Sequence, residues 1–139
     1  NHLIADVLAA APGTRCFRDP TRGGLASTLN ELADQAQADI MVDEEAVPVK
    51  DAVRGACDML GYDVLQVANE GKMVCVVAAD QAEAALAALR ANLYGRDAAI
   101  IGQVAEADLA RGPKVLLRTA FGSTRILDML VGEQLPRIC

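Results

Sequence analysis

The sequence predicts an α+β domain in which helices pack against a mixed β-sheet. Apolar residues recur at helical spacing in some segments and form short, nearly continuous runs in others. Helix-like and strand-like segments mix along the chain, with Gly, Pro, Asn and Asp between them and no internal repeat. A length of 139 residues is enough for one domain that buries its own core.

Four segments have the apolar spacing of an amphipathic helix. They cover residues 3–8, 25–36, 52–60 and 82–93. Gly61 is placed to end the third helix, because glycine adopts the left-handed conformation there without strain. Asp80 and Glu83 have the spacing of a capping box, which predicts the start of the fourth helix.

Six runs rich in apolar residues and separated by turn residues are predicted to be strands. They cover residues 38–42, 64–68, 73–79, 98–104, 115–117 and 124–127. The run from Met73 to Ala79 is almost wholly apolar, which predicts a strand in the centre of a sheet. The turn Asn69–Lys72 would then connect two neighbouring strands.

Charge and hydropathy exclude several classes of partner. The net charge is −6, the basic residues are scattered, the aromatic content is 3% and there is no Trp, so we expect no binding to nucleic acid. No apolar run approaches the roughly 20 residues that span a bilayer, and no signal-peptide pattern opens the chain. We therefore expect a soluble, cytoplasmic protein without a membrane partner. Helical spacing already at the first residues suggests a piece of a longer protein.

The cysteines have no spacing that predicts a metal site. There is no CxxC pair, and the one histidine is His2. Cys57 and Cys75 lie inside apolar patterns and Cys16 precedes a loop, so we expect all three to have packing roles. Cys139 differs, because it is the last residue and lies outside any apolar pattern.

The loop Asp19–Gly24 precedes the helix expected over residues 25–36. The free N–H groups and dipole of a helix N-terminus favour an anion such as phosphate, and glycine lets a ligand approach the backbone closely. An alternative is a capped helix start, with Asp19 or Thr21 as the N-cap and Pro20 at the first helical position. Spacing alone leaves both interpretations open.

The turn Asn69–Lys72 places the carboxylate of Glu70 between two predicted strands. A carboxylate that faces a cleft there could have a raised pKa and act as a base. A hairpin turn with solvated charges is the alternative.

Cys139 carries both a thiol and the terminal carboxylate of the chain. The carboxylate disfavours the thiolate, and Arg137 offsets this only in part. If the thiol reacts, its activation should come from the site or partner that receives it, which is consistent with a carrier. An incidental surface cysteine is the alternative.

Several motifs together resemble the HypE family of hydrogenase maturation factors. The resemblance covers essentially the whole chain, and the motifs that carry it are Asp19–Ala26 (DPTRGGLA), Ala46–Lys50 (AVPVK), Ala68–Lys72 (ANEGK), Ile101–Gly102 and Pro136–Cys139 (PRIC). The first motif is shared with the superfamily of aminoimidazole ribonucleotide synthetase, whereas the PRIC ending is specific. The resemblance implies a PurM-like C-terminal domain over residues 1–131 and a mobile tail over residues 132–139.

For function, the resemblance implies a two-domain, ATP-dependent carbamoyl dehydratase that lacks its N-terminal domain here. In such a protein the carbamoyltransferase HypF loads a carbamoyl group onto the terminal cysteine, here Cys139. ATP-dependent dehydration then gives a thiocyanate, whose cyano group passes to iron in the HypC–HypD complex. Glu70 is the expected base.

The resemblance also predicts part of a nucleotide site. Its expected residues are Asp19, Thr21, Arg22, Gly23, Gly24 and Asn69. ATP and Mg²⁺ would bind to the full-length protein, which is expected to form a homodimer. The 139-residue chain, without its own N-terminal domain, is expected to bind no cofactor tightly and to be inactive alone.

Two other functions fit the same sequence. The chain could belong to another ATP-dependent synthetase of the superfamily, although such a protein has no reason to end in PRIC. It could instead serve only as a binding module for the carbamoyltransferase or for the HypC–HypD complex.

Overall fold

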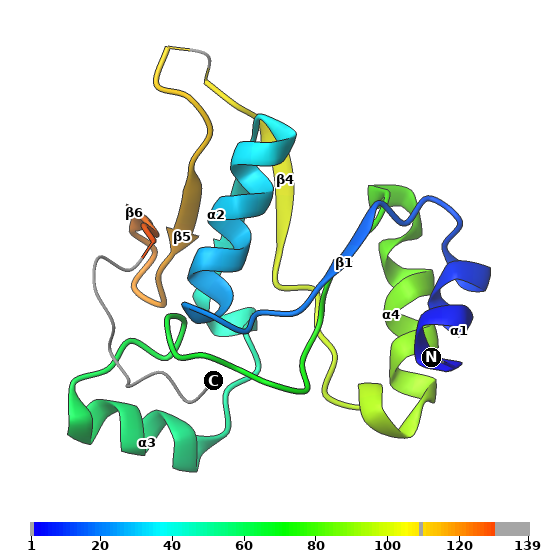
Figure 1. Ribbon diagram of the computed structural model, residues 1–139, viewed down its shortest axis with the longest axis horizontal. Helices are drawn as coiled ribbons and strands as arrows, with labels where there is room; N and C mark the ends of the chain where they lie inside the picture. Colours follow the sequence, from blue (N-terminus) through cyan, green and yellow to red (C-terminus); the bar gives the residue numbers. More distant parts are fainter. Residues whose placement is uncertain (1, 109, 130–139) are drawn as a thin grey trace.

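The computed structural model describes residues 2–108 and 110–129 and has the predicted α+β architecture (Figure 1). In chain order the elements are α1 (His2–Ala10), β1 (Cys16–Arg18), α2 (Gly24–Ala36), β2 (Ala38–Asp43), η1 (Glu44–Ala46), α3 (Asp51–Leu60), β3 (Val74–Val76), η2 (Ala79–Gln81), α4 (Ala82–Ala91), η3 (Leu93–Gly95), β4 (Gly102–Glu106), β5 (Val115–Arg118) and β6 (Thr124–Ile126). The η elements are single 3₁₀ turns. The predicted tail over residues 132–139, with Cys139, lies outside the described residues.

The larger sheet has four strands in the order β4-β2-β5-β6. β2 pairs antiparallel with β4 and parallel with β5, and β6 returns antiparallel to β5. The predicted mixed sheet is therefore confirmed. β1 and β3 form a separate antiparallel pair.

The main core lies between α2 and one face of the four-stranded sheet. Alternate residues of β2 and β5 point toward α2, as the period of two along a strand requires. The buried members of this core are Ala26, Leu29, Ala33, Ile40, Val42, Leu65, Val115, Leu117 and Leu127. The Asn30 amide of α2 donates to the Leu127 carbonyl, N to O 2.7 Å, which fastens the chain after β6 to the helix.

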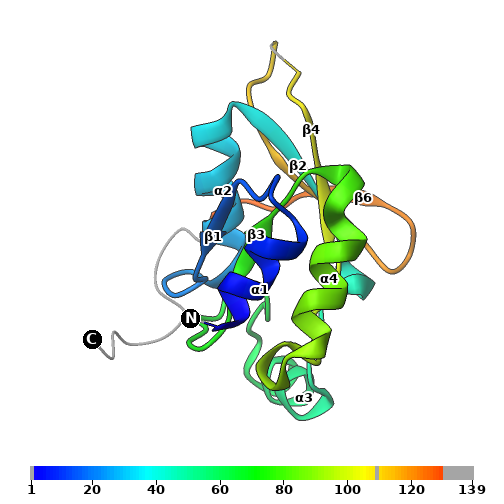
Figure 2. The same cartoon turned by 90° about the vertical axis from the view of Figure 1, so that its right-hand side faces the viewer.

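A second, smaller core joins α1 and α4, which lie side by side (Figure 2). Val7, Ala11 and Ala85 are buried there, and Phe17 and Cys75 from the two-stranded sheet pack against them. The segment that contains β1 therefore links this core to the start of α2.

Two strand predictions are wrong, and a third, over residues 98–104, is shifted, because the observed strand β4 covers Gly102–Glu106. Residues 64–68 form turns, because Leu65 is buried under the start of α2 and its N–H is held by the Asp63 carboxylate, N to O 2.9 Å. The next run is a strand only over Val74–Val76, and it pairs only with β1, so it is not central in a sheet. The apolar residues of both segments reflect packing in loops and in a small sheet.

Helix ends agree with the sequence in one case and differ in another. Gly61 ends α3 with φ 70°, as expected for a left-handed terminal glycine. The predicted capping box of α4 is absent, because Asp80 already lies inside the η2 turn and the cap position belongs to Gln81, without a side-chain cap. Among residues 2–108 and 110–129 there is no helix long and apolar enough to cross a membrane.

Candidate functional site

The two loops that the sequence singled out meet beside the N-terminal end of α2. The backbone N–H of Asn69 donates a hydrogen bond to the Pro20 carbonyl oxygen, with an N to O distance of 3.1 Å. Nearby, the Ala26 amide in the first turn of α2 donates to the Leu65 carbonyl, N to O 2.9 Å. The loop before α2 and the loop between α3 and β3 are thus joined by backbone contacts, although about 50 residues separate them in the sequence.

Glycine makes this contact possible. Gly23 and Gly24 have φ angles of 66° and 61°, a conformation that disfavours other residues. A Cβ atom on Gly24 would lie 2.5 Å from the Val67 carbonyl oxygen and 2.7 Å from that of Leu65. The second loop therefore packs against the backbone of the first because Gly24 has no side chain.

The alternative interpretation of the first loop, a start of α2 capped by the side chain of Asp19 or Thr21, is wrong. Gly23 occupies the cap position of α2, and no side chain caps the helix there. Asp19 and Thr21 lie further upstream. The turn formed by the two glycines delays the helix start until Gly24, so that neither polar side chain reaches the cap position.

A pocket of about 400 Å³ lies beside this helix start. It is lined by Arg18, Asp19, Thr21, Arg22, Thr28 and Glu31. Of the residues predicted to bind nucleotide, three therefore line the pocket, whereas Gly23, Gly24 and Asn69 shape the backbone next to it.

Three pocket residues, Arg18, Thr28 and Glu31, were not predicted from the sequence. Thr28 and Glu31 follow Gly24 by four and seven residues, so they share one helix face with it. Arg18 ends β1, and its guanidinium pairs with Glu31, N to O 2.5 Å. The helical spacing after the glycines was the signal that could have found the first two.

Glu70 lies on the exposed side of the second loop. The turn is not a hairpin, because residues 64–68 are not a strand and β3 begins only at Val74, but the Glu70 side chain is solvated, as that alternative expected. Gly71, with φ 74°, turns the chain directly after Glu70. Glu70 is not among the residues that line the pocket. Its neighbour Asn69, however, is hydrogen-bonded to Pro20 in the loop that lines it.

The described cysteines have packing environments. Cys57 is buried in α3, and Cys75 packs against the smaller core. Burial raises the pKa of the Cys75 thiol, and the nearby Cys16 thiol adds to the effect. These surroundings disfavour a thiolate. No group of three or more His, Cys, Asp or Glu side chains that could hold a metal occurs among residues 2–108 and 110–129.

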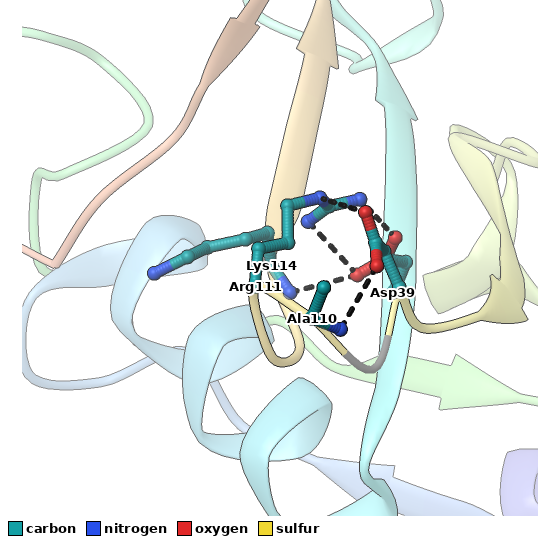
Figure 3. A network of polar contacts seen from close by, with 5 residues as sticks. Asp39, Ala110, Arg111 and Lys114 are labelled. Atoms are coloured by element: carbon teal, nitrogen blue, oxygen red, sulfur yellow. Dashed lines mark hydrogen bonds and ion pairs between the residues drawn. The ribbon is translucent and has the colours of Figure 1, made fainter.

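A second polar cluster lies near the other end of α2 (Figure 3). Asp39 of β2 is almost fully buried and accepts hydrogen bonds from the Arg111 guanidinium, N to O 2.6 Å, and from the Lys114 amide, N to O 2.8 Å. Arg111 and the Lys114 N–H hold the pKa of Asp39 below its usual value despite burial. This cluster fastens the loop between β4 and β5, and both oxygens of the Asp39 carboxylate accept hydrogen bonds from it.

The fold and the joined loops define the class of this protein. The family model described as "AIR synthase related protein, C-terminal domain" matches residues 2–112 of this chain, and the chain belongs to that family. Its predicted PurM-like fold is thereby confirmed.

Within that class the chain is similar to carbamoyl dehydratases. It is 54% identical over 139 residues to "Carbamoyl dehydratase HypE" of Rhodobacter capsulatus, covering 99% of this chain and 40% of the relative. A crystal structure of HypE in complex with ATP is 46% identical with a TM-score of 0.89, over 100% of this chain and 42% of that one. A crystal structure of a HypE–HypF complex is 40% identical with a TM-score of 0.85, and the match covers 93% of this chain and 41% of that one. The chain spans about 40% of the length of its curated relatives.

Proposed function

We propose that this chain is the C-terminal part of an ATP-dependent carbamoyl dehydratase of the HypE type. The observation that carries the proposal is the backbone hydrogen bond between Asn69 and Pro20, which brings the ANEGK loop beside the DPTRGG loop and its pocket. Relatives named carbamoyl dehydratase, and the ATP complex of one similar structure, support the reaction and its co-substrate.

In the proposed reaction a carbamoyl group on the thiol of Cys139 loses its oxygen and two protons. The amide oxygen is a poor leaving group, so transfer of the γ-phosphoryl group of ATP onto it lets it leave as phosphate. Breaking the C–O bond and removing both N–H protons gives the S-bound nitrile, ADP and phosphate, so all atoms of one water depart.

Glu70 is the proposed base for the amide protons. Its carboxylate is exposed and can accept a proton from a group brought to this surface. The bond between Asn69 and Pro20 holds its loop at a fixed place relative to the DPTRGG loop. A proton acceptor and the phosphoryl-binding loop would then act on the same amide.

The rest of the full-length protein supplies what the described residues do not. We propose that Asp19, Thr21 and Arg22 complete a nucleotide site formed mainly by an N-terminal domain. Since the described residues offer no cluster of metal ligands, Mg²⁺ would be held by that domain and the nucleotide. A HypF-type carbamoyltransferase, the HypC–HypD complex and a second copy are the proposed partners, in the cytoplasm.

The experiment follows the mass of the full-length protein that carries this chain. After incubation with the carbamoyltransferase, carbamoyl phosphate and ATP, Cys139 should first gain one carbamoyl group and then lose one water. Cys139→Ser is the matched control and should gain nothing. Loading without any loss of water in the presence of ATP would contradict the proposed dehydration.

A partner-binding module is the second candidate function, and the surface of α3 favours it. Met59 and Leu60 of this helix are 89% and 65% exposed. Exposed apolar side chains that lie together are typical of protein contacts. If binding is the whole role, the chain should bind the carbamoyltransferase without ATP. Met59→Asp should weaken this binding, whereas the control Leu93→Asp, on the separate η3 turn, should leave it unchanged.

A further inference from the structure

The hydroxyl of Thr28 is an unexplained polar group in the pocket. The residue is 4% exposed and lines the pocket. Its hydroxyl has no hydrogen-bond partner among residues 2–108 and 110–129. A buried hydroxyl without a partner destabilises a fold, whereas valine would fill the same space without that effect. Threonine at this position is explained if a ligand supplies the missing partner.

The surroundings of Thr28 favour a tetrahedral oxyanion. The pocket lies along the face of α2 that carries Thr28 and Glu31, and the loop before the helix supplies its other side. Arg22 lines the same pocket and has no ion pair or hydrogen bond within the described part of the chain. The hydroxyl of Thr28 and the free guanidinium of Arg22 are both donors to an anion.

The two carboxylates of the pocket restrict which anion fits. Glu31 is neutralised by its ion pair with Arg18. Asp19 has no such partner within the described residues and would repel an anion that carries no proton. Monohydrogen phosphate avoids this repulsion, because its P–OH can donate to Asp19 while its other oxygens accept from Arg22 and Thr28. Sulfate, which has no proton near neutral pH, lacks this match.

We infer that this pocket binds free inorganic phosphate, with Thr28 and Arg22 as donors and Asp19 as the acceptor that selects a protonated oxyanion. The biological meaning rests on the proposed function, in which phosphate leaves with the amide oxygen. The pocket would then hold the product after the C–O bond breaks.

The test measures the binding of inorganic phosphate to the 139-residue chain by ³¹P NMR line broadening and by the phosphate-dependent rise in Tm. We expect saturable binding of phosphate and weaker binding of sulfate. Thr28→Val should bind phosphate about tenfold more weakly, as loss of one hydrogen bond to a charged group implies. Thr28→Ser should restore most of the affinity.

Controls separate the pocket from general charge and from misfolding. Arg54→Gln removes a cation of α3 and should leave phosphate binding unchanged, whereas Arg22→Gln should weaken it. The Tm of each variant without phosphate shows whether it folds. Absence of saturable binding, or equal affinity in Thr28→Val and the parent chain, would overturn the inference. Phosphate binding by the chain together with no dehydration by the full-length protein would overturn the proposed function instead.

Discussion

The two ends of α2 are fixed in different ways. At the end that adjoins β2, the Asp39 carboxylate is bonded to Arg111 and Lys114 and has its partners within the chain. At the N-terminal end, the backbone contact at Gly24 holds the structure together, and polar side chains around Thr28 remain available. Polar groups that are paired within the chain support the fold, whereas polar groups without a partner among the described residues, such as the Thr28 hydroxyl, are suited to a ligand.

The largest expected effect is at the backbone contact. Gly24→Ala places a Cβ atom against two carbonyl oxygens at a φ of 61°, where neither neighbour is a flexible side chain. We expect a loss of about 2 kcal/mol or more in the free energy of unfolding, because the strained φ and the clash add. Chemical denaturation of the 139-residue chain measures it.

Gly55→Ala is the matched control for this substitution. Gly55 lies inside α3, and a Cβ atom there would meet nothing within 4 Å. We expect a gain of about 0.5–1 kcal/mol from helix propensity. If both alanine variants changed stability alike, the contact between the two loops would not depend on Gly24.

The next effect concerns the Asp39 cluster. Asp39→Asn removes the charge that pairs with Arg111, so we expect the Tm to fall by roughly 4–8 °C. Asp58→Asn on the exposed face of α3 should leave the Tm nearly unchanged. Equal Tm values for the two variants would mean that the Asp39 cluster does not hold the loop between β4 and β5.

The same carboxylate gives a pH dependence whose direction follows from its pKa. The folded pKa of Asp39 is lowered by Arg111, so its contribution to stability is present above the unfolded pKa of about 4. The contribution is lost as the pH falls through the lower folded pKa. We expect the Tm difference between the parent chain and Asp39→Asn to be constant near neutral pH and to shrink below about pH 4. A difference that grew on acidification would contradict this sign.

The smallest effect on stability is expected at the pocket. Thr28→Val removes a hydroxyl that has no described partner, so the Tm without ligand should stay the same or rise by about 1–3 °C. Thermal melting in phosphate-free buffer measures it. A marked decrease in Tm would show that the hydroxyl supports the fold and that the two ends of α2 do not differ as described.

Much of the fold followed from periodicity, and each error has its own cause. All four predicted helices are present, and β2, β5 and β6 lie where alternation or apolar runs placed them. The segment 64–68 was misread because Leu65 is apolar for a tertiary reason, its burial below α2. β1 was missed because it has only two apolar residues, Cys16 and Phe17, between Arg15 and Arg18, and so shows no strand pattern.

The site was predictable in its motifs but not in its shape. The sequence located Asp19, Thr21 and Arg22, which line the pocket, and it paired the two loops only through the resemblance. The contact of Gly24 with Val67 depends on chain topology, which spacing does not encode. The roles of Cys139 and Glu70 remain predictions.

The central claim is that the two loops form one site in which Glu70 takes protons from the carbamoyl group on Cys139. The most direct measurement is the intact mass, over time, of full-length protein with Glu70→Gln, with Glu83→Gln on α4 as the matched control. We expect both variants to be loaded at the normal rate, because loading does not need the base. After ATP is added, the Glu70→Gln protein should keep the carbamoyl group, whereas the Glu83→Gln protein should lose one water. Loss of water at the same rate in both would contradict the account and remove Glu70 from the reaction.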